Sequence, residues 1–138
     1  MSSYLIIDGY NLINKLPSLI DAKDKSIEHA RDKLFDLVQA YCDYSGVEGI
    51  IVFDGQGPER TIEEKNPTII FSRSGESADT VIESIIYNST DKENTRVVSD
   101  DVALINMVTG MGVFTISTSA FGKDLESTIK NMRDRLNE

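Results

Sequence analysis

Residues 4–11 read YLIIDGYN, an apolar run that ends abruptly at an aspartate and a glycine. The apolar part is nearly continuous rather than alternating, which is typical of a strand in a parallel sheet that helices cover on both faces. Similar short runs, rich in β-branched residues, occur at 49–53, 68–71, 96–98 and 113–116. The sequence therefore predicts five buried strands, of which the first spans residues 4–7.

Segments with helical periodicity separate most of these strands. Apolar residues recur every three or four positions from Ser26 to Tyr44, after Ser77, after Ser99-Asp100, and from Leu125 to Leu136. Ser99 is predicted to be the N-cap of the third of these helices. Glycines at positions 46 and 110 stand where helix C-caps are expected.

The order of the predicted elements is strand–helix–strand, a short connection, then strand–helix–strand–helix–strand–helix. Alternation of this kind favours a mainly parallel central sheet with helices on both faces, an α/β three-layer α/β/α sandwich. The chain has 138 residues, a length that suits one domain spanning residues 1–138.

The formal net charge is −9, with 23 acidic and 14 basic residues. This balance argues against a general nucleic-acid coat protein, which needs a basic face to displace counterions. It does not argue against a metal-dependent nuclease, which gathers acidic groups at its cutting site.

Three further features of the sequence indicate the cellular compartment of the protein. The single cysteine, Cys42, cannot form an internal disulfide, and no apolar run approaches the ~20 residues needed to span a bilayer. The first residues lack the basic and apolar regions of a signal peptide. We therefore expect a cytoplasmic protein without a membrane partner, and the sequence leaves its oligomeric state open.

Acidic residues follow the predicted strands. Asp8 ends the first run, Asp54 follows the second, and Asp100 follows the fourth, while Asp79 opens the helix after the third. In parallel sheets, ligands bind beyond the carboxyl ends of the strands, near the point where strand order reverses. Carboxylates gathered there repel one another unless a cation neutralises them, and hard oxygen ligands select Mg²⁺ or Mn²⁺. The pattern predicts phosphodiester hydrolysis at a metal site formed by Asp8, Asp79 and Asp100, with Asp54 as a further ligand.

Purely structural explanations exist for each of these positions. An aspartate after a strand is a common turn residue or helix N-cap, and Asp54 precedes a glycine. Asp101 is explained as a first-turn acid favoured by the helix dipole. Asn11 would orient the first aspartate, touch a phosphate or cap a helix. Ser117 and Ser119, after the last strand, would hold a phosphate or cap the last helix.

With these motifs in place, the sequence resembles the YacP-like NYN domains, a branch of the PIN-like nucleases. The resemblance covers nearly the whole chain. The segments that carry it are 7–11 (IDGYN), 52–55 (VFDG), 77–79 (SAD) with Glu83, 98–100 (VSD) and the hydroxyl-rich 117–121 (STSAF).

The resemblance implies an endoribonuclease with a PIN-like sheet and a divalent-metal site. It implies that Asp8, Asp79 and Asp100 form the acidic centre, with Asn11 and Asp54 near it. It also implies mRNA as substrate and a translating ribosome as partner, which would supply the binding surface that an acidic protein lacks. The residues expected to contact RNA are Asn11, Ser99, Ser117, Ser119 and Arg73, with Arg60 and Lys65 as further basic candidates.

Two alternatives remain. The first is a non-catalytic RNA- or ribosome-binding module of the same fold, which would bind metal without cutting. The second is a phosphoacceptor receiver domain with Asp54 as its phosphorylation site. Receivers need an acidic pair at the end of the first strand and a lysine after the last. Here Gly9 follows Asp8, and Ser117 follows the last strand, so the receiver interpretation is disfavoured.

Overall fold

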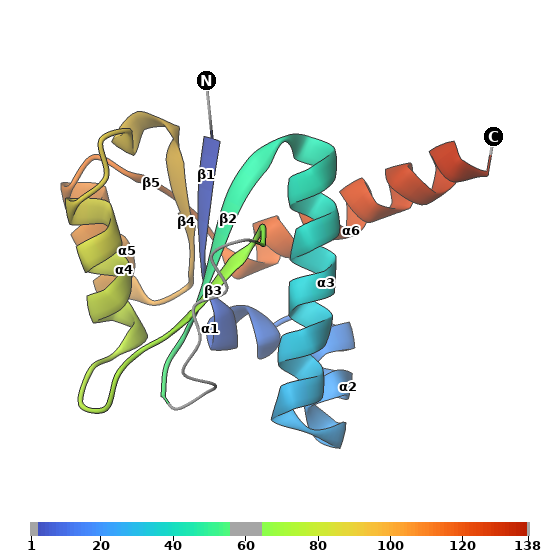
Figure 1. Cartoon of the computed structure of the whole chain (residues 1–138), viewed down its shortest axis with the longest axis horizontal. Helices are drawn as coiled ribbons and strands as arrows, with labels where there is room; N and C mark the ends of the chain where they lie inside the picture. Colours follow the sequence, from blue (N-terminus) through green and yellow to red (C-terminus); the bar gives the residue numbers. More distant parts are fainter. Residues whose placement is uncertain (1–2, 56–64, 138) are drawn as a thin grey trace.

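The structure is a computed structural model that describes residues 3–55 and 65–137, so Arg60 lies outside the described residues (Figure 1). The strands are β1 (Ser3–Asp8), β2 (Val47–Phe53), β3 (Thr68–Phe71), β4 (Thr95–Val98) and β5 (Phe114–Ile116). The helices are α1 (Gly9–Ile13), α2 (Pro17–Lys25), α3 (Ile27–Ser45), α4 (Ala78–Tyr87), α5 (Val102–Gly110) and α6 (Thr118–Leu136), with a 3-10 turn, η1 (Lys92–Asn94), before β4.

The strands of the described residues form one five-stranded sheet in the order β3-β2-β1-β4-β5. All four strand pairs are parallel. The chain builds outward from β1 through β2 to β3, and then crosses to the other side of β1 to add β4 and β5. Strand order therefore reverses between β1 and β4, which is where open α/β sheets bind their ligands. Receiver domains have the strand order 2-1-3-4-5, so the topology excludes the receiver alternative.

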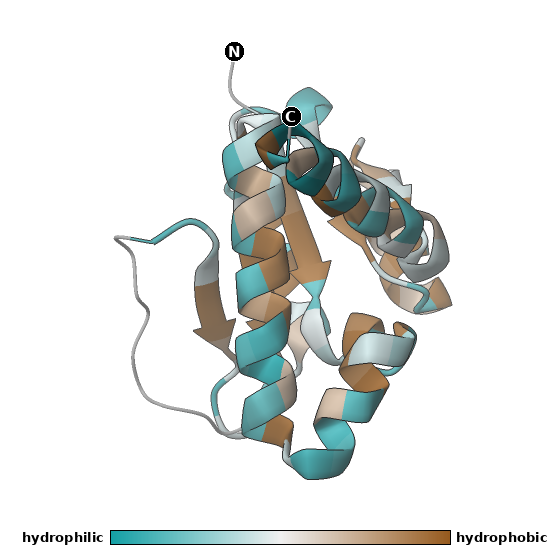
Figure 2. Ribbon diagram, turned by 90° about the vertical axis from the view of Figure 1, so that its right-hand side faces the viewer, coloured by the Kyte–Doolittle hydropathy of each residue, from teal (hydrophilic) through white to brown (hydrophobic). Residues whose placement is uncertain are grey.

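Helices cover both faces of the sheet, which confirms the predicted α/β/α layers. α1, α2, α3 and α6 lie over one face, and α4 and α5 lie over the other (Figure 1). Side chains of β1 alternate between the two cores, with Leu5 and Ile7 in the first and Ile6 in the second. Figure 2 shows hydrophobic strands beside helices that carry polar residues on their outer surfaces. Although α3 and α6 each have 19 residues, no helix in 3–55 or 65–137 is apolar and long enough to cross a membrane.

All the predicted strands and helices are present, most of them with shifted ends. The third strand spans the predicted residues 68–71, and the helix predicted from residue 26 is α3. Ser26 caps α3 by accepting a hydrogen bond from the His29 backbone N–H at 3.0 Å. Gly46 is its C-cap, with a φ of 70° that suits glycine.

Four features of the helices differ from the prediction, one of which is that Gly110 is the last residue of α5 and Met111 is its C-cap. Helices α1 and α2 were not predicted, because α1 has only five residues and α2 buries only Leu19 and Ala22, too few to reveal a helical period. The N-cap of α5 is Asp101 rather than Ser99. The last helix begins at Thr118, seven residues before the predicted apolar stripe, because Ser117 caps it there.

Gly9 allows α1 to begin directly after the strand. A Cβ atom at this position would lie 2.4 Å from the Phe53 ring and 3.1 Å from Ile51 Cγ2. We expect Gly9→Ala to lower the free energy of unfolding by about 1–3 kcal/mol, because the ring must shift within a packed core. Urea unfolding in EDTA measures the change. Gly110→Ala is the matched control, because nothing lies within 4 Å of its added Cβ; equal losses in both variants would contradict the packing argument.

Candidate functional site

The carboxyl ends of the central strands surround an open cavity of about 320 Å³. It lies where strand order reverses, beside the last residue of β1 and the segment after β4. The residues that line it are Asp8, Tyr10, Asn11, Asn14, Asp54, Ser77, Ala78, Asp79 and Asp101. Four of these nine are aspartates, contributed by the ends of β1 and β2, the first turn of α4 and the segment before α5.

A buried serine hydroxyl fixes the first aspartate. Ser99 is 0% exposed, and its hydroxyl donates to Asp8 Oδ2 at 2.9 Å. The Ser99 hydroxyl oxygen also accepts the Asp101 backbone N–H at 3.0 Å. One hydroxyl therefore joins the end of β1 to the segment after β4, and it holds two cavity aspartates in a fixed relation.

A second hydroxyl group holds Asp54, and a third caps the helix that carries Asp79. The buried Ser72 donates to Asp54 Oδ1 at 3.2 Å and accepts the Gly55 N–H at 2.9 Å, which fixes the turn after β2. Ser77 caps α4 by accepting the Thr80 N–H at 3.2 Å. Because Ser77 caps this helix, the side chain of Asp79 in its first turn is not needed as a cap.

The cavity aspartates influence one another electrostatically. The pKa of Asp8 is raised from 3.8 to about 6, chiefly by burial and also by the charges of Asp79, Asp101 and Asp54, although the Ser99 hydrogen bond lowers it. Burial also raises the pKa of Asp79, with the charges of Asp101 and Asp54 as further causes. The carboxylates that repel one another are therefore the four that line the cavity.

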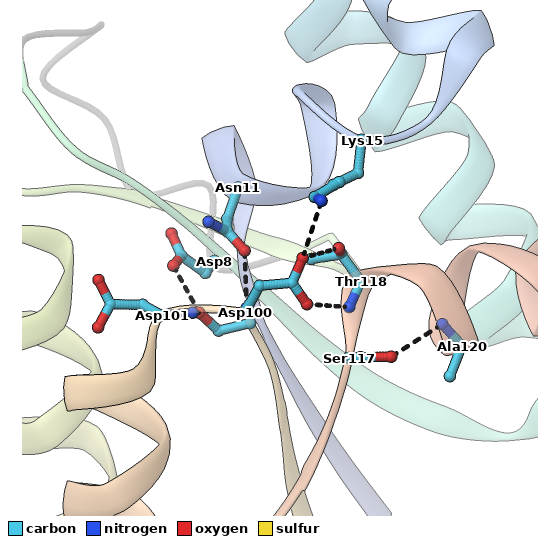
Figure 3. Close-up of polar contacts among 9 residues, drawn as sticks. Asp8, Asn11, Lys15, Asp100, Asp101, Ser117, Thr118 and Ala120 are labelled. Carbon is cyan, nitrogen blue, oxygen red and sulfur yellow. Dashed lines mark hydrogen bonds and ion pairs between the residues drawn. The ribbon is translucent and has the colours of Figure 1, made fainter.

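Asp100 and Asp101 point in different directions (Figure 3). The carboxylate of Asp100 accepts the Thr118 N–H at 2.9 Å and also the Thr118 hydroxyl, and Lys15 Nζ lies 3.9 Å from its Oδ2. Although burial alone would raise the pKa of Asp100, the Thr118 hydrogen bonds and the Lys15 charge hold it below its ordinary value.

The sequence grouped Asp100 with Asp8 and Asp79, but Asp100 is not among the residues that line the cavity in the structure. Asp101 lines the cavity with those two residues, while Asp100 faces the start of α6. The physical reason is that the backbone at Asp101 is extended, and successive side chains of an extended segment point to opposite sides.

The residues predicted to contact RNA do not all lie at the cavity. Asn11 lines the cavity and its Oδ1 accepts the Asp100 N–H at 2.7 Å. Ser99 is fully buried, and its hydroxyl makes the internal hydrogen bonds described above. Ser117 caps α6 by accepting the Ala120 N–H at 3.1 Å. Ser119 and Arg73 are exposed but are not among the residues that line the cavity.

Sequence reasoning missed the part of the site that α1 supplies. Tyr10 and Asn14 line the cavity with Asn11. Asn11 and Asn14, three residues apart, lie on one side of the helix. Arg31 of α3, whose side chain is 14% exposed, donates to the Tyr10 hydroxyl at 3.1 Å and lies 5.4 Å from the centre of the Phe71 ring. Prediction of a helix at residues 9–13 would have identified Tyr10 and Asn14 as residues on one side of the cavity.

The donor chemistry of the cavity suits a hard divalent cation. Within residues 3–55 and 65–137, no group of three or more His, Cys, Asp or Glu side chains is close enough to hold a metal ion on its own. Mg²⁺ usually keeps several waters and is bound by only one or two carboxylates together with substrate phosphates. Binding shared between carboxylates and substrate phosphates fits the cavity, which presents the carboxylates of Asp8, Asp54, Asp79 and Asp101.

Comparisons with known proteins agree with the fold. The sequence profile of the YacP-like NYN domain family matches residues 5–138. "Uncharacterized protein YacP" of Bacillus subtilis (strain 168) is 38% identical over 84 residues, which cover 59% of this chain and 49% of that protein. The aligned region thus spans about half the length of this curated relative.

Two solved structures are similar over nearly the whole chain. One is the crystal structure of Rae1 (YacP) from Bacillus subtilis, which is 28% identical with a TM-score of 0.83 and covers 99% of this chain and 80% of that one. The other is a point mutant of the same protein, 27% identical with a TM-score of 0.83, covering 98% of this chain and 81% of that one.

Proposed function

We propose, on the premise that this chain belongs to the YacP-like NYN domain family, that it is a divalent-metal-dependent endoribonuclease. Family and fold support a nuclease-type function related to RNA. The observation that carries the finer proposal is the gathering of Asp8, Asp54, Asp79 and Asp101 around one cavity at the reversal of strand order. The proposed substrate is mRNA, and the proposed partner is the translating ribosome.

The proposed roles of the cavity residues follow from their hydrogen bonds and charges. Asp8 and Asp79, with Asp54 and Asp101, would hold Mg²⁺ or Mn²⁺. When bound, this ion neutralises the carboxylates, polarises an RNA phosphate and lowers the pKa of a bound water. Ser99 holds Asp8, and Ser72 holds Asp54, so both carboxylates are oriented before substrate arrives. Such preorganisation is worth more than the same groups would be on flexible loops.

The overall charge supports the ribosome as a partner. A net charge of −9 repels RNA, and the cavity itself is acidic, so the isolated chain is expected to bind RNA weakly. A ribosome would hold the mRNA and bring it to the cavity. We therefore expect cleavage of translated mRNA to be much faster than cleavage of the same RNA free in solution.

The experiment is an end-labelled mRNA incubated with the purified chain, with translating ribosomes present or absent, in Mg²⁺ or in EDTA. Discrete internal cuts that need Mg²⁺ are expected, with a large increase in the presence of ribosomes. A parallel preparation of Asp79→Asn controls for contaminating nucleases. If RNA or ribosomes are bound but no cut appears in any condition, the non-catalytic binding module of the same fold becomes the better explanation.

A further inference from the structure

The segment that carries Asp100 and Asp101 is held at three consecutive residues. Ser99 Oγ accepts the Asp101 N–H at 3.0 Å, and Asn11 Oδ1 accepts the Asp100 N–H at 2.7 Å. Asp101 Oδ1 in turn accepts the Leu104 N–H at 3.0 Å at the start of α5. Each of these bonds fixes the direction in which one side chain leaves the backbone.

Asp100 adds a tether to a second helix. Its carboxylate accepts both the backbone N–H and the hydroxyl of Thr118, the first residue of α6. Thr118 is 0% exposed, so water cannot replace these bonds. A backbone N–H in the first turn of a helix has no intrahelical partner, and a carboxylate at that end is favoured by the helix dipole. Asp100 is thus engaged with donors of its own chain on the side away from the cavity.

We propose that Asp100 is a positioning residue: by anchoring the segment 99–101 to Thr118, it presents Asp101 to the acidic cavity. The inference rests on the proposed function, because it assumes that the cavity binds a divalent cation. It assigns different requirements to two neighbouring aspartates. Asp100 needs oxygen atoms that accept hydrogen bonds, whereas Asp101 needs its negative charge.

Asparagine and alanine substitutions separate these requirements. Asp100→Asn keeps the shape of the side chain and one oxygen for the Thr118 N–H, and the Thr118 hydroxyl can rotate to accept from the new amide. Asp100→Ala removes both acceptors. Asp101→Asn keeps an oxygen for the Leu104 N–H but removes the charge. The conservative change should therefore rescue position 100 and fail to rescue position 101.

The test measures Mn²⁺ binding to the full chain by electron paramagnetic resonance, amide hydrogen exchange at Thr118, and RNA cleavage. We expect Asp100→Ala to weaken Mn²⁺ binding about tenfold, as loss of a residue that supports a metal ligand does, and to speed Thr118 exchange. Asp100→Asn should bind Mn²⁺ within about twofold of the unmodified chain, because it preserves the supporting hydrogen bond. Asp101→Asn should lose at least about tenfold in binding, with Thr118 exchange unchanged.

Two results would overturn the inference while the proposed function stands. One is a loss of Mn²⁺ binding in Asp100→Asn as large as in Asp101→Asn, which would make Asp100 a ligand. The other is unchanged Thr118 exchange in Asp100→Ala, which would remove the tether. An unmodified chain that neither binds Mn²⁺ nor cuts RNA would overturn the proposed function, and this inference with it.

Discussion

We expect RNA cleavage to fall at least about a hundredfold when Asp79 is replaced by asparagine, which corresponds to a loss of about 2.7 kcal/mol of transition-state stabilisation. Asp79 lines the cavity, and its pKa is raised by burial and then by the charges of Asp101 and Asp54. Asparagine keeps the shape of the side chain but removes the charge that attracts a cation. The fold should persist, because Ser77 caps α4.

The measurement is the rate of cleavage of a translated mRNA in Mg²⁺, with thermal unfolding in EDTA to verify that the variant is folded. Asp134→Asn is the matched control, because Asp134 is exposed in the last turns of α6 and does not line the cavity. The control should cut at the rate of the unmodified chain. Full activity in Asp79→Asn would remove Asp79 from the proposed centre.

Replacing Asp8 with asparagine is expected to abolish cleavage and, in the absence of metal, to stabilise the fold. The pKa of Asp8 is raised from 3.8 to about 6, chiefly by burial, so the folded chain binds a proton more tightly than the unfolded chain between these pH values. Stability therefore falls as the pH rises from about 4 to about 6. Asparagine cannot ionise, so at about pH 7 the variant should be more stable by about 2–3 kcal/mol, and near pH 4 the difference should vanish.

Urea unfolding of both proteins across this pH range in EDTA measures the effect. Added Mg²⁺ should then stabilise the unmodified chain, because an ion that binds only the folded state adds to its stability, and it should have little effect on the variant. Asp134→Asn should follow the unmodified chain throughout. If Asp8→Asn is less stable at pH 7, then burial of the Asp8 charge does not oppose folding as argued. If Mg²⁺ stabilises both proteins equally, then the Asp8 charge does not contribute to binding of the ion.

The predicted strands and the long helices were found because their signals are local. Continuous apolar runs such as 68–71 indicate strands buried on both faces, and the stripe within α3 repeats often enough to reveal its period. Helices α1 and α2 were not predicted, because neither the five residues of α1 nor the two buried positions of α2 define a period. With α1 missed, the contributions of Tyr10 and Asn14 to the cavity were missed too.

By itself, the sequence determined the α/β class and the edge of the sheet where the aspartates gather. Both follow from periodicity and from which residues end each strand. Only the tertiary structure decided which of two adjacent aspartates faces the cavity. That choice depends on Asn11 and Thr118, which bond to Asp100 from 89 and 18 residues away in the chain. Hydrogen bonds between such distant residues leave no periodic signal in the sequence, because they form only when the folded chain brings α1, the segment after β4 and α6 together.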